Sequence, residues 1–293
     1  KVAFDSWWDS RRADFSPAHP PVRGVFSITK PLDTACTEDT WSAMESASAD
    51  PRDRHTAVWT GTEMIVWGGY GGEYLSTGGR YNPATDTWTA TPTGPDTPAA
   101  RQSHSAVWTG TEMIVWGGRD RLGELSTGGR FDPIANSWRP TTVVDAPEQR
   151  TGASIFWTGT KDLVWGGGGC LHGCQPLNTG GLYDPASDTW TSTNASASAP
   201  FKRYSYSAVW TGNEMIVWGG NNGSPSVPFQ SGARYNPASD SWAPTSIGGN
   251  VPAPRYEHTA VWTGSEMIVW GGSVQGSYFV TGGRYNPTTD SWA

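Results

Sequence analysis

Residues 55–69 read HTAVWTGTEMIVWGG, and residues 76–88 read STGGRYNPATDTW. The same pair of phrases returns over residues 104–138, 153–190, 206–242 and 258–292. The second tryptophan of each copy, at positions 67, 116, 165, 218 and 270, therefore recurs every 49 to 53 residues. Self-similarity at a period near 50 residues is typical of propellers and related arrays.

Each copy contains four short segments with strand character. In the first copy, residues 55–59 alternate small or polar with apolar side chains, and residues 63–67 form an apolar run that a diglycine ends. Residues 79–81 and 87–90 are two shorter extended pieces. Thr-Gly-Thr-Glu separates the first two segments and Asn-Pro followed by Asp separates the last two, and both are turn signals. Four antiparallel strands in each unit predict the blades of an all-β propeller.

At these residues the chain resembles the kelch family. The signature is Arg-x-x-His, an apolar strand closed by Gly-Gly, then Tyr-Asn-Pro and a Trp, and here it is formed by Arg52, His55, 64–69, 81–83 and Trp88. The resemblance extends over about residues 37–293 and implies a kelch propeller of the bacterial extracytoplasmic type. The third copy departs most from the pattern, since Ala153 replaces the His and Leu182 replaces an Arg.

The number of blades depends on the N-terminal region. Residues 1–36 do not follow the repeat, whereas residues 37–41 match the last segment of a copy. Six outer-strand tryptophans thus accompany five complete repeats, which are residues 52–91, 101–141, 150–193, 203–245 and 255–293. We expect a propeller over residues 37–293 with six blades, the first divergent, and five blades as the alternative. Residues 1–36 would belong to the first blade or form an anchoring arm.

Composition excludes some classes of function. The net charge is −7 and the basic residues are spread along the repeats, which argues against a nucleic-acid partner. No apolar stretch approaches the length of a membrane span. Fifteen of the 18 tryptophans occupy three fixed positions in the repeats, which favours core packing over sugar stacking. Scarce lysine, abundant Ser, Thr, Gly and Asn, and a first residue other than Met favour a secreted or periplasmic protein whose leader has been removed.

The connections differ in how much they vary from one copy to the next. The turns after the first and third segments are nearly constant, whereas the connections at 70–75, 119–125, 168–178, 221–230 and 273–280 differ in length and chemistry. Binding residues concentrate on irregular loops held by a rigid frame, so we expect a protein partner on this variable side. The alternative is that the sequences and lengths of these connections differ only because no function constrains them. Aromatic and Arg side chains dominate interfaces, and the candidate partner-binding residues are Tyr70, Tyr74, Arg119, Arg121, Asn221, Phe229, Tyr278 and Phe279.

An arginine opens the first strand of every repeat. These residues, Arg52, Arg101, Arg150, Arg203 and Arg255, would ring the central channel. Guanidinium groups could bind a small acidic ligand there, or they could donate to loop carbonyls as structural residues. Three histidines, His55, His104 and His258, share one repeat position, and we expect them to satisfy backbone groups rather than bind a metal.

The third variable connection contains Cys170 and Cys174, with His172 between them. The spacing is compatible with a disulfide, with free thiols or with a soft metal site, and the disulfide is the favoured reading. Cys36 is left over. No catalytic residues, cofactor or metal centre can be located from spacing. We therefore expect a non-catalytic protein-binding or scaffolding propeller. Such a propeller could be a subunit of a larger extracytoplasmic assembly. The alternative is a carbohydrate or sugar-acid binder, or an epimerase- or oxidase-like enzyme, that uses the arginines of the channel.

Overall fold

The computed structural model describes residues 50–169, 175–223 and 227–293. Within these ranges every regular element is a β-strand, and residues Ser46–Ala293 form one compact unit. Residues 1–36, Trp41 and the three cysteines lie outside the described residues.

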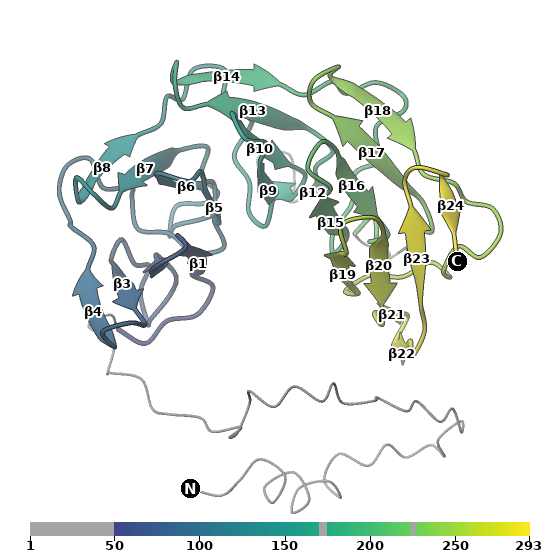
Figure 1. The fold of residues 1–293 in the computed structure, drawn as a ribbon, viewed down its shortest axis with the longest axis horizontal. Coiled ribbons are helices and arrows are strands. Elements are labelled where there is room, and N and C mark those ends of the chain that lie inside the picture. The colour runs from purple at the N-terminus through teal and green to yellow at the C-terminus, as the bar shows by residue number, and fades with distance from the viewer. Residues whose placement is uncertain (1–49, 170–174, 224–226) are drawn as a thin grey trace, which may run out of the picture. The chain divides into compact units, whose positions relative to one another are not determined.

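Five four-stranded antiparallel sheets follow one another around an arc (Figure 1). Each sheet is one repeat, as the sequence predicts. The first contains β1 (Thr56–Trp59), β2 (Met64–Trp67), β3 (Gly78–Asn82) and β4 (Thr87–Ala90); the second contains β5 (Ser105–Trp108), β6 (Met113–Trp116), β7 (Gly128–Asp132) and β8 (Ser137–Pro140). The third contains β9 (Ser154–Trp157), β10 (Asp162–Trp165), β13 (Gly180–Asp184) and β14 (Thr189–Ser192). The fourth contains β15 (Ser207–Trp210), β16 (Met215–Trp218), β17 (Gly232–Asn236) and β18 (Ser241–Pro244), and the fifth β19 (Thr259–Trp262), β20 (Met267–Trp270), β23 (Gly282–Asn286) and β24 (Ser291–Trp292).

Two short ribbons extend from the sheets. They are β11 (Gly168–Gly169) with β12 (Gln175–Pro176), and β21 (Ser273–Val274) with β22 (Ser277–Tyr278). Both belong to the connections between the second and third strands of a sheet, so two of the variable connections have regular structure of their own.

The constant turns are fixed by local hydrogen bonds. In the first sheet Thr60 N–H donates to Glu63 O at 2.9 Å, and the Thr60 hydroxyl accepts from Glu63 N–H at 2.9 Å. In the next turn Asn82 Oδ1 accepts from Ala84 N–H at 2.9 Å. Asp86 has a φ of 52°, a left-handed conformation that Asp and Asn tolerate better than most residues. These are the turns that the Thr-Gly and Asn-Pro signals predict.

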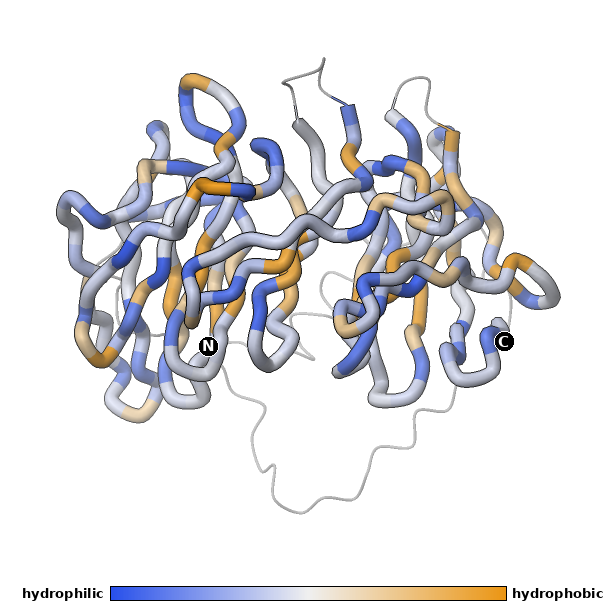
Figure 2. Tube along the Cα trace, turned by 90° about the horizontal axis from the view of Figure 1, so that it is seen from above, coloured by the Kyte–Doolittle hydropathy of each residue, from blue (hydrophilic) through white to orange (hydrophobic). Residues whose placement is uncertain are grey.

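The core lies between neighbouring sheets. In the first four sheets the tryptophan of the second strand is buried, and it contacts the outer-strand tryptophan of the following sheet. Ring centroids are 5.1 Å apart for Trp67 and Trp138, and 5.3 Å apart for Trp116 and Trp190. In the tube view (Figure 2) many hydrophobic segments lie in the strands between the two faces that carry the connections. The second-strand tryptophans of the first four sheets and the outer-strand tryptophans that they contact are therefore core residues, as their regular spacing predicts.

The pattern stops at the first and fifth sheets. Trp270 is 58% exposed, although its four equivalents are 0–1% exposed. Trp59, which faces outward from the first sheet, is 53% exposed. These faces lack a neighbouring sheet among the described residues, which agrees with a propeller of roughly six blades.

An outer-strand clamp links consecutive sheets. Trp190 Nε1 donates to Thr142 O at 3.1 Å, and Asp188 Oδ1 accepts from Thr142 N–H at 3.0 Å. The same oxygen accepts from the Tyr183 hydroxyl at 2.6 Å. Equivalent contacts join the third sheet to the fourth and the fourth to the fifth.

The first and second sheets lack this clamp. Pro92 stands where Thr142 stands in the next repeat, and proline has no N–H to donate. Phe131 and Asn136 replace the Tyr and the Asp. The buried Trp138 Nε1 also has no hydrogen-bond partner.

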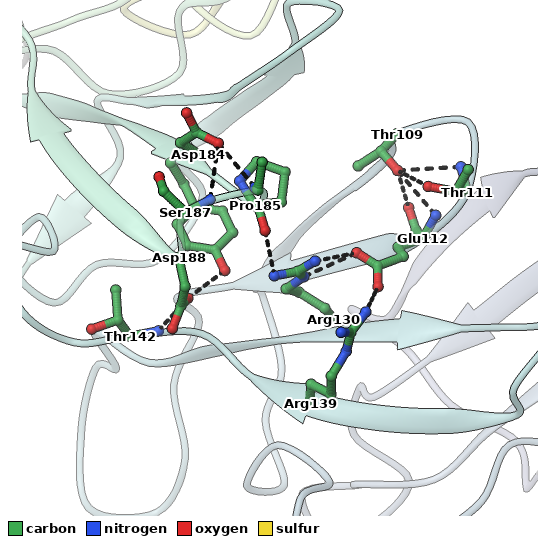
Figure 3. A network of polar contacts seen from close by, with 12 residues as sticks. Thr109, Thr111, Glu112, Arg130, Arg139, Thr142, Asp184, Pro185, Ser187 and Asp188 are labelled. Carbon is green, nitrogen blue, oxygen red and sulfur yellow. Dashed lines mark hydrogen bonds and ion pairs between the residues drawn. The ribbon is translucent and has the colours of Figure 1, made fainter.

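A second contact between sheets involves the arginine of the third strand. Arg130 Nε and Nη2 donate to Glu112 Oε2 at 2.9 and 2.8 Å, and Nη1 donates to Pro185 O of the next sheet at 2.7 Å (Figure 3). Arg139 donates to the other oxygen of Glu112. In the third sheet Lys161 and Leu182 occupy the positions of this Glu and Arg, so the pair is absent there.

Candidate partner-binding face

The antiparallel order of the strands gives each sheet two ends with different connections. One end carries the constant turns, and we call it the constant face. The other end, the variable face, carries the connections from the second to the third strand and from one sheet to the next. In the edge-on view of Figure 2 these connections lie at opposite sides of the sheets.

The five repeated arginines lie beneath the variable face, and their guanidinium groups donate hydrogen bonds to backbone carbonyls of the chain itself. Arg101 Nη1 donates to Gly117 O at 2.9 Å and to Thr127 O at 2.6 Å, and its Nε donates to Ala99 O at 2.9 Å. Arg52, Arg150, Arg203 and Arg255 make the corresponding contacts. Burial lowers the pKa of Arg101, Arg150 and Arg203 to about 10, which leaves them charged at neutral pH. These groups hold loop carbonyls, the structural role that the sequence offered as one reading.

A chain of backbone contacts links neighbouring sheets just after these arginines. The second residue after each arginine has a positive φ, between 50° and 62°, in all five repeats. Ser103 N–H donates to Arg54 O at 3.0 Å, Gly152 N–H to Ser103 O at 3.1 Å, and Glu257 N–H to Ser205 O at 3.0 Å. No such bond joins the described residues Ser205 and Gly152. The chain is therefore interrupted between the third and fourth sheets.

A cavity of about 480 Å³ opens at this interruption. Tyr204 and Tyr206 line one side, and glycines 152, 167 and 168 line the other. The Tyr206 hydroxyl donates to Trp165 O at 3.0 Å, at the position where three of the other repeats carry His. A second hollow of about 370 Å³ lies between the first and second sheets, with Tyr74 and Arg121 in its lining. The variable face is thus hollowed at two places.

Several predicted partner-binding residues are accessible on this face. Tyr70, Arg119 and Arg121 are exposed, and Tyr278 is 85% exposed. Tyr74 is half-buried and packs edge-on against Tyr70, with ring centroids 5.5 Å apart. These residues come from the first, second and fifth sheets.

Three other predicted residues are turned inward. The guanidinium of Arg203 lies 4.7 Å from the ring centroid of Phe229, and that of Arg255 lies 4.2 Å from the ring centroid of Phe279. Asn221 is buried, and its Oδ1 accepts from Gly223 N–H at 2.9 Å. These contacts hold the bases of the loops.

Two exposed apolar side chains were not among the sequence candidates. Leu122 is 87% exposed and Val280 is 81% exposed, each next to a predicted residue. An apolar residue at the tip of a polar connection is the signal that could have identified them. Together with Tyr278, they place exposed side chains with apolar surface on the connections of the second and fifth sheets.

Two of the three repeated histidines are buried, and the third is exposed. His104 and His258 are buried against Trp67 and Trp218, and the atoms His104 Nε2 and Thr56 Oγ1 lie 2.7 Å apart. Burial lowers the pKa of His104 to about 3 and that of His258 to about 4. His55 is exposed. Among the described residues no three His, Cys, Asp or Glu side chains gather into a set that could hold a metal ion, and no helix there could span a membrane.

The repeated four-stranded sheets and the signature residues define a kelch-repeat β-propeller. The chain belongs to the KLHDC2/KLHL20/DRC7 Kelch-repeats domain family, whose model matches residues 31–220 and 152–293.

Three curated proteins contain similar segments. The chain is 31% identical over 86 residues to the dynein alpha chain of the flagellar outer arm of Chlamydomonas reinhardtii, which covers 29% of this chain and 2% of that protein. It is 29% identical over 114 residues to tip elongation aberrant protein 1 of Schizosaccharomyces pombe, covering 38% of this chain and 10% of the relative. It is 32% identical over 102 residues to the leucine-zipper-like transcriptional regulator 1 homolog of Drosophila melanogaster, covering 34% and 10%. The chain thus matches a tenth or less of the length of these relatives.

Proposed function

We propose that this propeller is a non-catalytic protein-binding module whose partner docks on the variable face. The observation that carries the proposal is the contrast between the two faces. The constant face repeats the same tight turns, whereas the connections of the variable face carry the exposed Tyr70, Arg121, Leu122, Tyr278 and Val280 and are hollowed at two places, one of them lined by Arg121. Exposed aromatic, Arg and apolar side chains are what protein interfaces use as anchors.

The relatives support a role in assemblies. The names of the three curated proteins describe a motor chain, a factor in tip elongation and a transcriptional regulator. All three contain a segment similar to this chain within a much longer protein. A propeller that serves as an interaction module inside such proteins agrees with the proposal. A scaffolding role within an extracytoplasmic assembly, and a disulfide between Cys170 and Cys174, stay predictions.

The experiment compares two sets of surface substitutions. Tyr70→Ser, Arg121→Ser and Tyr278→Ser are combined in a variable-face variant, and Ile134→Ser and Thr288→Ala form a matched variant on the constant face. Partners that co-purify with the wild-type chain should be lost from the first variant and retained by the second. Circular dichroism and thermal melting establish that both are folded. A folded variable-face variant that retains every partner would overturn the proposal.

The alternative function is a binder of small acids or sugar acids in the arginine-lined channel. The donors of these arginines already serve carbonyls, as described for Arg101. A ligand there would have to displace those contacts, so we favour the protein partner.

A further inference from the structure

The chain of backbone contacts that follows the repeated arginines has two free ends at the junction of the third and fourth sheets. Gly152 N–H donates to Ser103 O at 3.1 Å, and Ser205 O accepts from Glu257 N–H at 3.0 Å. The other backbone groups of these two residues, Gly152 O and Ser205 N–H, have no hydrogen-bond partner within the described ranges. Both residues are exposed, so a ligand can approach these groups. At the other described junctions the equivalent N–H and carbonyl bond each other directly.

A cavity of about 480 Å³ lies at this junction and is lined by both of these residues. Tyr204 forms one wall. A Cβ atom added at Gly168 would lie 2.5 Å from Tyr204 Cε1, so the glycine allows this ring to approach the third sheet. Tyr206 also lines the cavity, and its hydroxyl is fixed by the bond to Trp165 O at 3.0 Å. Contacts across the junction therefore hold the walls in place.

The lining favours an uncharged ligand. Arg203 is its one charged side chain, and no carboxylate or amine is among the other lining residues. Arg203 Nε donates to Phe201 O at 2.9 Å, and Nη1 donates to Gly219 O and to Ser231 O, both at 2.8 Å. The side chain is buried, so its charge is directed at these carbonyls rather than at the cavity.

The two free backbone groups select for an amide. An amide carbonyl can accept from Ser205 N–H while the amide N–H donates to Gly152 O, which would restore the interrupted chain of contacts. A carboxylate has no donor for Gly152 O, and an ammonium group has no acceptor for Ser205 N–H. A hydroxyl could serve both groups through a single atom, but an amide also presents a flat face to the ring of Tyr204.

We propose that the protein partner inserts the carboxamide of an Asn or Gln side chain between the third and fourth sheets, against Gly152 O and Ser205 N–H. The inference rests on the proposed function, because the carboxamide belongs to the partner that docks on the variable face. It also fixes the position of the partner around the ring, since the other three described junctions are closed by their own backbone bonds.

The test is a titration of the ¹⁵N-labelled chain with N-acetylglutamine methylamide, followed by NMR at the Ser205 amide. A saturable shift of this resonance is expected. The methylamides of N-acetylglutamate and N-acetylmethionine have side chains of similar length but lack the carboxamide. They should bind at least about tenfold more weakly, because each loses a hydrogen bond to the site. The methylamide of N-acetylserine tests a hydroxyl as the bound group.

Substitutions at Gly152 block the site with residues that other repeats carry at this position. Gly152→Arg and Gly152→Glu copy Arg54 and Glu257, whose φ values of 52° and 56° are close to the 62° of Gly152. A Cβ atom at Gly152 would meet no atom within 4 Å, so the new side chains are accommodated and extend into the cavity. Both should weaken binding of the glutamine probe by about tenfold or more.

The controls are Ser103→Arg and Ser103→Glu, at the equivalent position of a junction that its own backbone bond closes. They should leave probe binding unchanged, and the use of both charges excludes a purely electrostatic effect. The inference is overturned if the glutamine probe gives no saturable shift at Ser205, if another probe binds as tightly, or if the Gly152 and Ser103 variants have equal effects.

The partner itself separates this inference from the proposed function. A partner that is lost from the combined variable-face variant and also from Gly152→Arg supports the inference. A partner that is lost from the combined variant but binds Gly152→Arg with unchanged affinity would overturn the carboxamide site and leave the proposed function standing.

Discussion

The indole rings of Trp218 and Trp292 pack against each other across the junction of the fourth and fifth sheets, with centroids 5.1 Å apart and planes inclined by 54°. The same relationship joins Trp165 to Trp242 at 5.3 Å and 56°. One aromatic contact is thus used at four junctions, and its repetition makes each sheet depend on its neighbours. A blade of four short strands cannot bury its apolar faces alone, which is the general reason why such repeats occur in arrays.

The first prediction concerns the end of this series. Trp218→Ala should lower the free energy of unfolding by about 3–5 kcal/mol because it leaves a large cavity. A propeller of roughly six blades requires a further blade against Trp270, so Trp270→Ala should cost about the same despite the exposure of this ring among the described residues. Urea unfolding of both variants measures this. A loss below about 1 kcal/mol for Trp270→Ala would mean that the ring faces solvent.

The second prediction concerns the missing clamp. Phe131→Tyr with Asn136→Asp should install the hydroxyl–carboxylate bond that Tyr183 and Asp188 form at 2.6 Å. We expect a gain of about 1 kcal/mol in stability, as for a typical buried hydrogen bond. Thermal melting of the double variant tests this, with Tyr183→Phe as the converse change that should destabilise. A double variant that melts below the wild-type chain would contradict the prediction.

The third prediction concerns Asp162. This residue is fully buried, both carboxyl oxygens lack partners, and burial raises its pKa well above the usual value. Four other repeats carry Met here. The unfolded carboxyl ionises near pH 3.9, so the wild-type chain should lose stability as the pH rises above about 4.

Asp162→Met should therefore stabilise the protein at neutral pH by about 1–3 kcal/mol, and by less near pH 4. Urea unfolding at the two pH values provides the comparison. An equal gain at both would show that folding does not raise the pKa of Asp162 and that packing alone accounts for the change.

The fourth prediction concerns His104, whose effect has the opposite sign. Its folded pKa of about 3 lies below the unfolded value near 6.5, so the unfolded state binds more protons between these values. Stability should fall as the pH drops through this window. His104→Tyr copies the residue that the fourth sheet carries at this position, Tyr206, and it should flatten this part of the pH profile. An unchanged profile would exclude His104 as its source.

Much of the fold could be predicted from the sequence because a strand or turn that is ambiguous in one copy of the repeat is supported by the other copies. Five copies of the same turn chemistry fix the strands and separate the two faces. The period could also have placed Phe229 and Phe279 correctly. They occupy the repeat position of Leu75, Leu125 and Leu177, which is apolar in every copy. A recurring apolar position in an otherwise variable connection indicates a buried anchor.

Other features could not be predicted from the sequence. The separation of Arg234 from Glu214 depends on distances across a junction, and the same two residue types form close pairs in the first and second sheets. The cavity beside Tyr204 likewise depends on how the third and fourth sheets meet around the channel. Spacing identifies which residues repeat, but it does not give the gaps between blades.

The central claim is that a protein partner covers the variable face, and hydrogen exchange on the purified complex tests it most directly. Amides in 70–75, 119–125 and 275–280 should exchange more slowly with the partner bound, while the turns at 60–63 and 109–112 should be unaffected. Protection confined to the constant turns, with unchanged exchange in the variable connections, would contradict the account.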